Sequence, residues 1–175
     1  MPVKLQGATA VRKALAQFEP NLAKNVNQEI ASFLKPVARE ARGYLPSNDS
    51  VPSGWLKRPN ANGRWANRFY DAAIARKSIT YRSTPSKPNR SGFVALASLF
   101  NKSAAGAIYE TAGRKSGVRG NFTPKLGGQL KGEGQKMTGR AMYRAFEEDR
   151  GKAVVGVVKA IEKAVARFDA MKDKV

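Results

Sequence analysis

Apolar residues recur every three or four positions in a long stretch near the start of the chain. The recurring positions of this stretch are Leu22, Val26, Ile30, Phe33, Leu34, Val37, Ala41 and Leu45. Such spacing puts side chains on one stripe of a helix, so it predicts an amphipathic helix beginning at Pro20 and stopping at Gly43 and Pro46. Pro36 lies inside the pattern and has no backbone N–H, which predicts a kink or a break at that point.

A second stripe occupies the C-terminal third. A short apolar start at Met142, Tyr143 and Phe146 precedes Gly151, a residue that can interrupt a helix. The stripe then consists of Val154, Val158, Ile161, Val165 and Phe168, widened by Val155, Val157 and Ala164. Basic residues such as Lys159 and Lys163 fall on the other side. The pattern predicts a second amphipathic helix with the valines toward the core.

Two short segments between the helices have the β-branched and aromatic bias of strands. They are residues 78–81 (SITY) and 93–96 (FVAL), and the proline- and glycine-containing segment 83–92 between them indicates a hairpin loop. A third apolar segment, residues 107–109, fits either a strand or the start of a helix. Residues 46–64 are dominated by turn-forming residues and predict an extended loop, with Trp55 packing it down.

These elements predict one α+β domain over residues 1–175. Long N-terminal and C-terminal amphipathic helices would cover one face of a small antiparallel β-meander. Residues 113–139 combine many glycines with Lys and Arg and contain few apolar residues. A segment of this composition buries too little surface to offset its ordering entropy, so it is expected to be a flexible Gly/basic arm.

Composition narrows the function. The chain has no Cys and no His, which removes thiol nucleophiles, thiolate metal sites and the commonest general base. A metal site made of carboxylates alone or a Ser–Lys pair would remain for catalysis, but the 13 acidic residues are mostly scattered. We therefore predict a protein that is not an enzyme and that needs no cofactor or metal. The formal net charge is +19, from 32 Lys and Arg against 13 Asp and Glu, which points to a polyanion as partner: nucleic acid or an acidic protein surface.

The sequence also indicates where the protein works. No apolar run approaches the roughly 20 residues that span a bilayer, and the first residues lack the apolar core of a signal peptide. We expect that the protein is made in a cytoplasm and that it does not bind a membrane.

Three local patterns are compatible with chemistry but have simpler interpretations. Residues 113–116 (GRKS) lack the spacing of a phosphate-binding loop. The acidic run 147–149 (EED) fits a helix N-terminus better than a metal site. The aromatic and basic residues of segment 55–70 could stack on bases, but such rings are more often anchors of a loop or core.

Three segments resemble a known family. Residues 101–115 read NKSAAGAIYETAGRK, residues 139–150 read GRAMYRAFEEDR, and residues 35–42 read KPVAREAR with Pro46 close behind. In this order they resemble the head–tail connection proteins of siphophages, nearest to the tail-completion or neck family of phages of Gram-positive hosts. The chain departs from that family's pattern in the longer 46–64 loop, which replaces a Pro-x-x-Thr-Gly turn, and in the length of the 113–139 arm.

The resemblance implies a structural virion protein in the head–tail neck, made and assembled in the host cytoplasm. It implies a homo-oligomeric ring that joins the portal-side connector to the tail tube or tail terminator and leaves a channel for genomic DNA. It leaves open which layer of the neck the chain would form: adaptor, stopper, tail completion or terminator. The alternative that the charge favours is a sequence-independent nucleic-acid-binding protein.

The candidate residues come from the resembling segments and the basic arm. For contact with neighbouring subunits or DNA they are Tyr109, Glu110, Gly113, Arg114, Lys115, Arg119, Lys125, Lys131, Lys136, Arg140, Tyr143 and Phe146.

Overall fold

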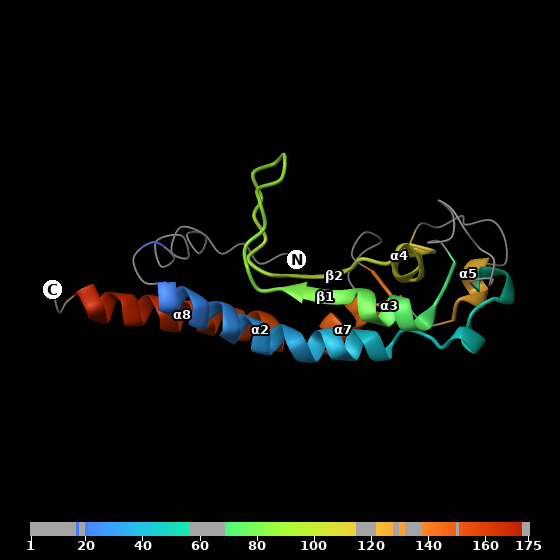
Figure 1. Cartoon of the computed structure of the whole chain (residues 1–175), viewed down its shortest axis with the longest axis horizontal. Helices are drawn as coiled ribbons and strands as arrows, with labels where there is room; N and C mark the ends of the chain where they lie inside the picture. Colours follow the sequence, from blue (N-terminus) through green and yellow to red (C-terminus); the bar gives the residue numbers. More distant parts are fainter. Residues whose placement is uncertain are drawn as a thin grey trace. The chain divides into compact units, whose positions relative to one another are not determined.

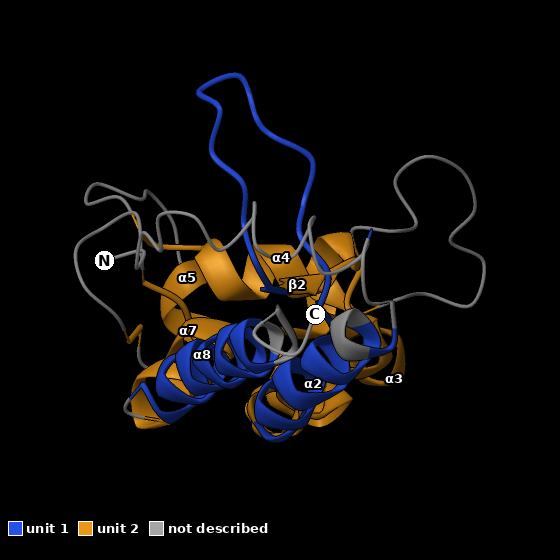
Figure 2. Cartoon of the chain, turned by 90° about the vertical axis from the view of Figure 1, so that its left-hand side faces the viewer, with its two compact units in different colours: residues 1–36, 81–98, 151–175 blue, residues 37–80, 99–150 orange. Residues whose placement is uncertain are grey.

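A computed structural model describes residues 17, 20–56, 69–114, 122–127, 130–131, 138–149 and 151–172. The chain divides into two compact units, each built from separate segments (Figure 2). Unit 1 comprises residues 1–36, 81–98 and 151–175, and unit 2 comprises residues 37–80 and 99–150. The first long helix and both strands each begin in one unit and end in the other. The prediction of one domain stays a prediction.

The first long helix is confirmed. Helix α2 spans Pro20–Gly43 and buries Val26, Ile30, Val37, Ala38 and Ala41 along one face. Pro36 does not break it, since α2 continues through this position for a further seven residues. Leu45, the last residue of the predicted stripe, lies beyond the helix end and is still buried.

Unit 1 contains an antiparallel helix pair, formed by the first part of α2 and by helix α8, Lys152–Lys172 (Figure 1). The Nζ atom of Lys163 lies 3.2 Å from the Oε1 atom of Glu29. Seven residues earlier in α8, Gly156 lies against the ring of Phe33. The buried core between the helices consists of Val26, Ile30, Ala160 and Ala164, with Leu34, Ala97 and Val157 packed beside it.

The face that α8 buries differs from the predicted one. The buried residues of α8 are Ala153, Gly156, Ala160, Ile161 and Ala164. At 100° per residue, this small-residue face is centred roughly 100° from the predicted valine stripe. Val154, Val158 and Val165 are only partly buried, and Val155 is 52% exposed. The prediction was right for Ile161 and Ala164, which belong to the predicted stripe and are buried, and wrong for these four valines, because close helix packing at Phe33 selects small residues such as Gly156.

Unit 2 begins with the last part of α2, from Val37, and the loop that follows this helix. The described part of this loop, residues 46–56, contains the 3-10 turns η1 (Asn48–Ser50) and η2 (Ser53–Trp55). The prediction that Trp55 packs this loop is confirmed, because its buried ring lies 4.9 Å from the ring of Tyr70 and 5.2 Å from that of Phe122. The Tyr70 hydroxyl donates a hydrogen bond to the Pro46 carbonyl at 2.8 Å. Trp55 and Tyr70 are therefore anchors and not base-stacking residues.

The next elements are helix α3 (Ala72–Ser78), strand β1 (Ile79–Arg82) and strand β2 (Ser98–Asn101). The two strands form an antiparallel sheet, so the first predicted strand is confirmed within one residue. The second was wrong: residues 93–96 belong to a hairpin that precedes β2. The apolar segment 107–109 lies in helix α4 (Ala104–Thr111), so it adds no third strand to the described sheet and a meander is not observed.

In the described ranges, helices α4, α5 (Phe122–Lys125) and α7 (Met142–Glu148) lie between β2 and α8. Gly151, with φ of +75°, lies between α7 and α8, so the predicted interruption of the C-terminal helix at this glycine is confirmed. The flexible Gly/basic arm stays a prediction, because most of residues 113–139 lie outside the described ranges; in the described part of this segment, Leu126 is 1% exposed. This one leucine inserts into unit 2 despite its polar neighbours. The coarse α+β class is confirmed. None of the helices in the described ranges is both long and apolar enough to cross a bilayer.

Candidate functional site

Two of the three segments that carry the family resemblance, 101–115 and 139–150, contact each other inside unit 2. Glu110, on α4, is 2% exposed, and its carboxylate reaches the first turn of α7. One carboxylate oxygen accepts the backbone N–H groups of Ala141 at 2.8 Å and Met142 at 3.0 Å. The other accepts the N–H of Tyr143 at 3.0 Å. A helix leaves its first N–H groups without intrahelical partners, so Glu110 caps α7 from another helix.

Arg140 makes the reciprocal contact. Arg140 is 5% exposed. Its guanidinium donates hydrogen bonds to the Tyr109 carbonyl, at 3.0 Å, and to the Ala112 carbonyl. These carbonyls lie at the C-terminal end of α4, where a cation is favoured. A third bond runs from the Nε atom to the Gly127 carbonyl at 3.2 Å. Burial lowers the pKa of the Arg140 guanidinium, and the nearby Glu110 carboxylate acts in the opposite direction. We call Glu110 and Arg140 the α4–α7 capping pair.

Two glycines make room for this arrangement. A Cβ atom on Gly139 would lie 1.9 Å from the Oε1 atom of Glu110, and so would displace the capping carboxylate. Gly113 has φ of +82°, which strongly favours glycine, and a Cβ atom there would lie 2.5 Å from Thr123. Residues 109–113 (YETAG) and 139–141 (GRA), from the two resembling segments, are thus explained by the fold of unit 2.

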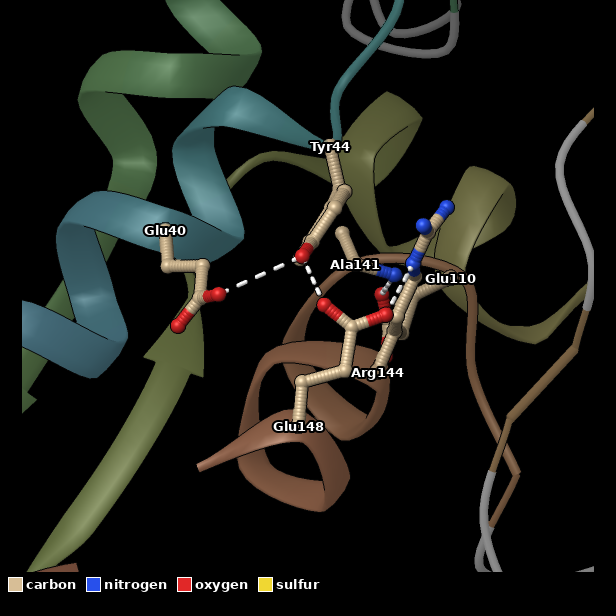
Figure 3. Close-up of polar contacts among 6 residues, drawn as sticks. All are labelled: Glu40, Tyr44, Glu110, Ala141, Arg144 and Glu148. Carbon is tan, nitrogen blue, oxygen red and sulfur yellow. Dashed lines mark hydrogen bonds and ion pairs between the residues drawn. The ribbon is translucent and has the colours of Figure 1, made fainter. Parts of the chain in front are cut away.

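A polar cluster at the ends of α2 and α7 is more exposed (Figure 3). The Tyr44 hydroxyl donates to the carboxylate of Glu148 and, at 3.3 Å, to that of Glu40. Arg144 donates from its Nε atom to Glu148 at 2.8 Å and stacks over the Tyr44 ring at 4.0 Å. The acidic run 147–149 therefore closes the end of α7, and its predicted position in a first helical turn was wrong.

Hydrogen bonding sets the protonation of this cluster. The bond to Glu148, assisted by burial and the charge of Glu40, raises the pKa of Tyr44 to about 12. The same bond, together with the one from Arg144, lowers the pKa of the Glu148 carboxyl. The bond to Glu148 also raises the pKa of Arg144. Each group therefore keeps its ordinary charge state at neutral pH, which suits a structural contact and not proton transfer.

The candidate residues divide into four sets. Tyr109, Glu110 and Arg140 are buried, so these three side chains do not face DNA or another subunit in this structure. Arg114 stacks over the Tyr143 ring at 5.0 Å beside the turn at Gly113, and both side chains are partly buried. Lys125, Lys131 and Phe146 are exposed. Lys115, Arg119 and Lys136 lie outside the described residues.

Sequence reasoning missed a set of cations. No Asp or Glu occurs in residues 72–109, while six Lys and Arg side chains there are all exposed. They are Arg76, Lys77, Arg82, Lys87, Arg90 and Lys102. The absence of Asp and Glu from residues 72–109 could have identified these cations. The prediction favoured the 113–139 arm instead, because the cations of the arm are closer together in the sequence.

The described residues contain no group of three or more Asp and Glu side chains placed to hold a metal ion. The features of the described residues that could contact a partner are exposed apolar side chains and exposed cations. Comparison of the chain with protein-family models, with curated proteins and with solved structures finds no match.

Proposed function

We propose that this chain is a structural subunit that assembles with copies of itself into a ring at the head–tail neck of a long-tailed phage. The ring would join the portal-side connector to the tail and leave a channel for genomic DNA. The family resemblance of the sequence motivates this proposal, and the make-up of unit 1 supports it.

The supporting observation is the small core of unit 1. Among the described residues, the buried apolar side chains of this unit are Val26, Ile30, Ala153, Ala160, Ile161 and Ala164, and three of these six are alanines. Such a core stabilises a helix pair weakly, because an alanine removes much less apolar surface from water than a leucine or valine. Unit 1 therefore gains more than most folds from a further apolar surface.

The chain offers apolar side chains for such a surface. We define the valine flank of α8 as Val154, Val155, Val158 and Val165, which are all partly or largely exposed. Phe33, on the partner helix, is 38% exposed. A ring needs one face of each subunit to fit a different face of the next, and apolar helix faces can supply such a contact.

The charge of the chain sets a condition on the ring. Each copy carries +19, so copies repel one another unless an anion lies nearby. DNA in the channel and acidic neighbouring proteins would both offset this repulsion. A ring around a nucleic acid is thus compatible with the charge, whereas a free ring is favoured by higher salt.

Sedimentation velocity and negative-stain microscopy of the purified chain test assembly. We expect closed rings with a central hole, more abundant at 0.5 M salt than at low salt. Val155→Glu should reduce the ring fraction by about tenfold, because a buried charge replaces an apolar contact. The matched control is Ile74→Glu, since Ile74 is 49% exposed in unit 2 and should leave the rings unchanged.

Antibody labelling of virions tests the location. Label should concentrate at the junction of head and tail. Label elsewhere on the particle, or particles free of the protein, would contradict the proposal.

The second candidate function is sequence-independent binding of nucleic acid by the free chain. The exposed cations of residues 72–109 favour it. It predicts DNA binding by monomers and no place in the finished particle, so the labelling experiment separates the two.

A further inference from the structure

The segment between β1 and β2 forms an ordered hairpin, residues 83–97, which we call the 83–97 hairpin. The Ser86 N–H donates to the Ala95 carbonyl at 2.8 Å, and the Ala95 N–H donates to the Ser86 hydroxyl at 3.0 Å. Figure 2 shows it as a blue loop that stands clear of the α2 and α8 helices of its own unit. Residues 87–93 at its tip are all exposed.

Asn89 organises the tip. Its side-chain oxygen accepts the N–H groups of Ser91 and Phe93, both at 2.9 Å. Its carbonyl accepts the Gly92 N–H at 2.9 Å, and Gly92 has φ of +71°, a conformation that favours glycine. These bonds fix the backbone of the tip before any partner arrives, so binding incurs less ordering entropy.

The tip presents two cations. Lys87 and Arg90 lie on either side of Asn89, and both are exposed. Neither forms an ion pair with any residue in the described part of the chain. The nearest acidic residues in the sequence are Asp71 and Glu110, so the hairpin itself carries no compensating charge.

We propose that the tip of the 83–97 hairpin, through Lys87 and Arg90, binds the phosphate backbone of duplex DNA. The inference deepens the proposed function and rests on it for the place where the tip would meet the genome. Phosphate oxygens are contacted by single Lys and Arg side chains and need no matching apolar surface.

A protein partner fits the tip less well. Stable protein interfaces bury about 800 Å² on each side around an apolar centre. The tip offers seven exposed residues, of which Phe93 is the large apolar one. The geometry therefore favours a narrow contact with a polyanion, made without regard to base sequence.

Binding of the full-length chain to a fluorescent 30-base-pair duplex, measured by anisotropy from 50 to 300 mM salt, tests the proposal. Losing two phosphate contacts in Lys87→Ala/Arg90→Ala should lower the slope of log K against log salt by about 1.8, with affinity at 50 mM reduced about tenfold or more. Lys87→Arg/Arg90→Lys, which keeps both charges, should bind like the wild type.

The matched control is Lys152→Ala/Lys159→Ala. Both lysines are exposed on α8 in the same unit, and the change in net charge is identical. The control should keep the wild-type slope. Equal losses in both double variants would mean that affinity follows net charge alone, and would overturn the proposal. A wild-type chain that ignores the duplex at 50 mM salt would also overturn it, and would favour an acidic protein as partner.

Sedimentation of the same variants separates this inference from the proposed function. Lys87→Ala/Arg90→Ala should form rings like the wild type, because the tip lies outside the valine flank. Loss of DNA binding in the hairpin variant of a chain that never forms rings would support the hairpin contact and count against the neck. Rings whose DNA binding does not depend on the hairpin would overturn the hairpin contact alone.

Discussion

Units 1 and 2 are stabilised in different ways. Unit 2 joins its segments with polar side chains that bind backbone groups: Glu110 and Arg140 between α4 and α7, Arg42 to the Ile79 carbonyl, and Arg76 to the Leu45 carbonyl. In the described part of unit 1, six small or medium apolar side chains are buried, and the exposed ion pair Lys163–Glu29 links the two helices. An exposed pair of this kind contributes at most about 1 kcal/mol. Under the proposed function, unit 2 would be complete in one chain, and other copies would complete unit 1.

Removing the Glu110 carboxylate should have the largest effect on stability. Glu110→Ala leaves three N–H groups at the start of α7 without acceptors in a buried place, so we expect a loss of about 3 kcal/mol. Urea unfolding followed by circular dichroism measures it. Glu110→Gln keeps one oxygen acceptor and should lose about half as much. A Glu110→Ala chain within about 0.5 kcal/mol of the wild type would break the contrast, since capping would then contribute little.

Crowding the capping pair should cost somewhat less. Gly139→Ala brings a Cβ atom against the Glu110 carboxylate, which is held by three hydrogen bonds and cannot move away easily. We expect a loss of about 2 kcal/mol in the same unfolding experiment. Gly54→Ala is the control, because nothing lies within 4 Å of the added atom. Equal stability of the two variants would show that the close approach at Gly139 is relieved at no cost.

The equivalent change in unit 1 should be milder. Gly156→Ala places a Cβ atom 2.4 Å from the ring of Phe33, a side chain that is partly exposed and free to rotate outward. The expected loss of stability is about 1 kcal/mol. This variant should also weaken ring formation in sedimentation, because the shifted ring changes the apolar surface. A loss above that of Gly139→Ala would reverse the ranking of the two units.

The smallest effect concerns the Tyr44 cluster and pH. The pKa of Tyr44 is raised in the folded state to about 12 from an unfolded value of 10.0. The stability it contributes is therefore complete below pH 10 and is lost as pH rises toward 12. In a tyrosinate absorbance titration, Tyr44→Phe should remove a step near pH 12 and reduce this alkaline loss. Removal of a step near pH 10 would show that the hydroxyl is not held by Glu148.

The sequence predicted the helices better than the contacts between them. The stripe of α2 and the stop at Gly43 follow from local spacing and composition, and both were confirmed. The buried face of α8 could not be found in this way, because Gly156 is selected by the closeness of Phe33, a residue more than 120 positions away in the chain. The prediction of a strand at 93–96 was wrong for a related reason. The side chain and the carbonyl of Asn89 accept the N–H groups of Ser91, Gly92 and Phe93, and so make this segment part of a hairpin.

The candidate residues illustrate the same limit. Glu110 and Arg140 were chosen because they lie in segments that resemble the neck family. In the structure both side chains are used within the chain, where they cap α7 and α4. Lys87 and Arg90 belong to no motif, and their significance depends on where the fold presents them. Charge composition favours a polyanion as partner, which stays a prediction, and it does not identify the residues that would contact one.

Hydrogen exchange of the full chain, measured at protein concentrations below and above ring formation, tests the central claim most directly. If copies complete unit 1, amides of α8 should gain about tenfold protection on assembly, while those of α4 and α7 should keep theirs. Unchanged exchange in α8 once rings have formed, or a change confined to α4 and α7, would contradict the account.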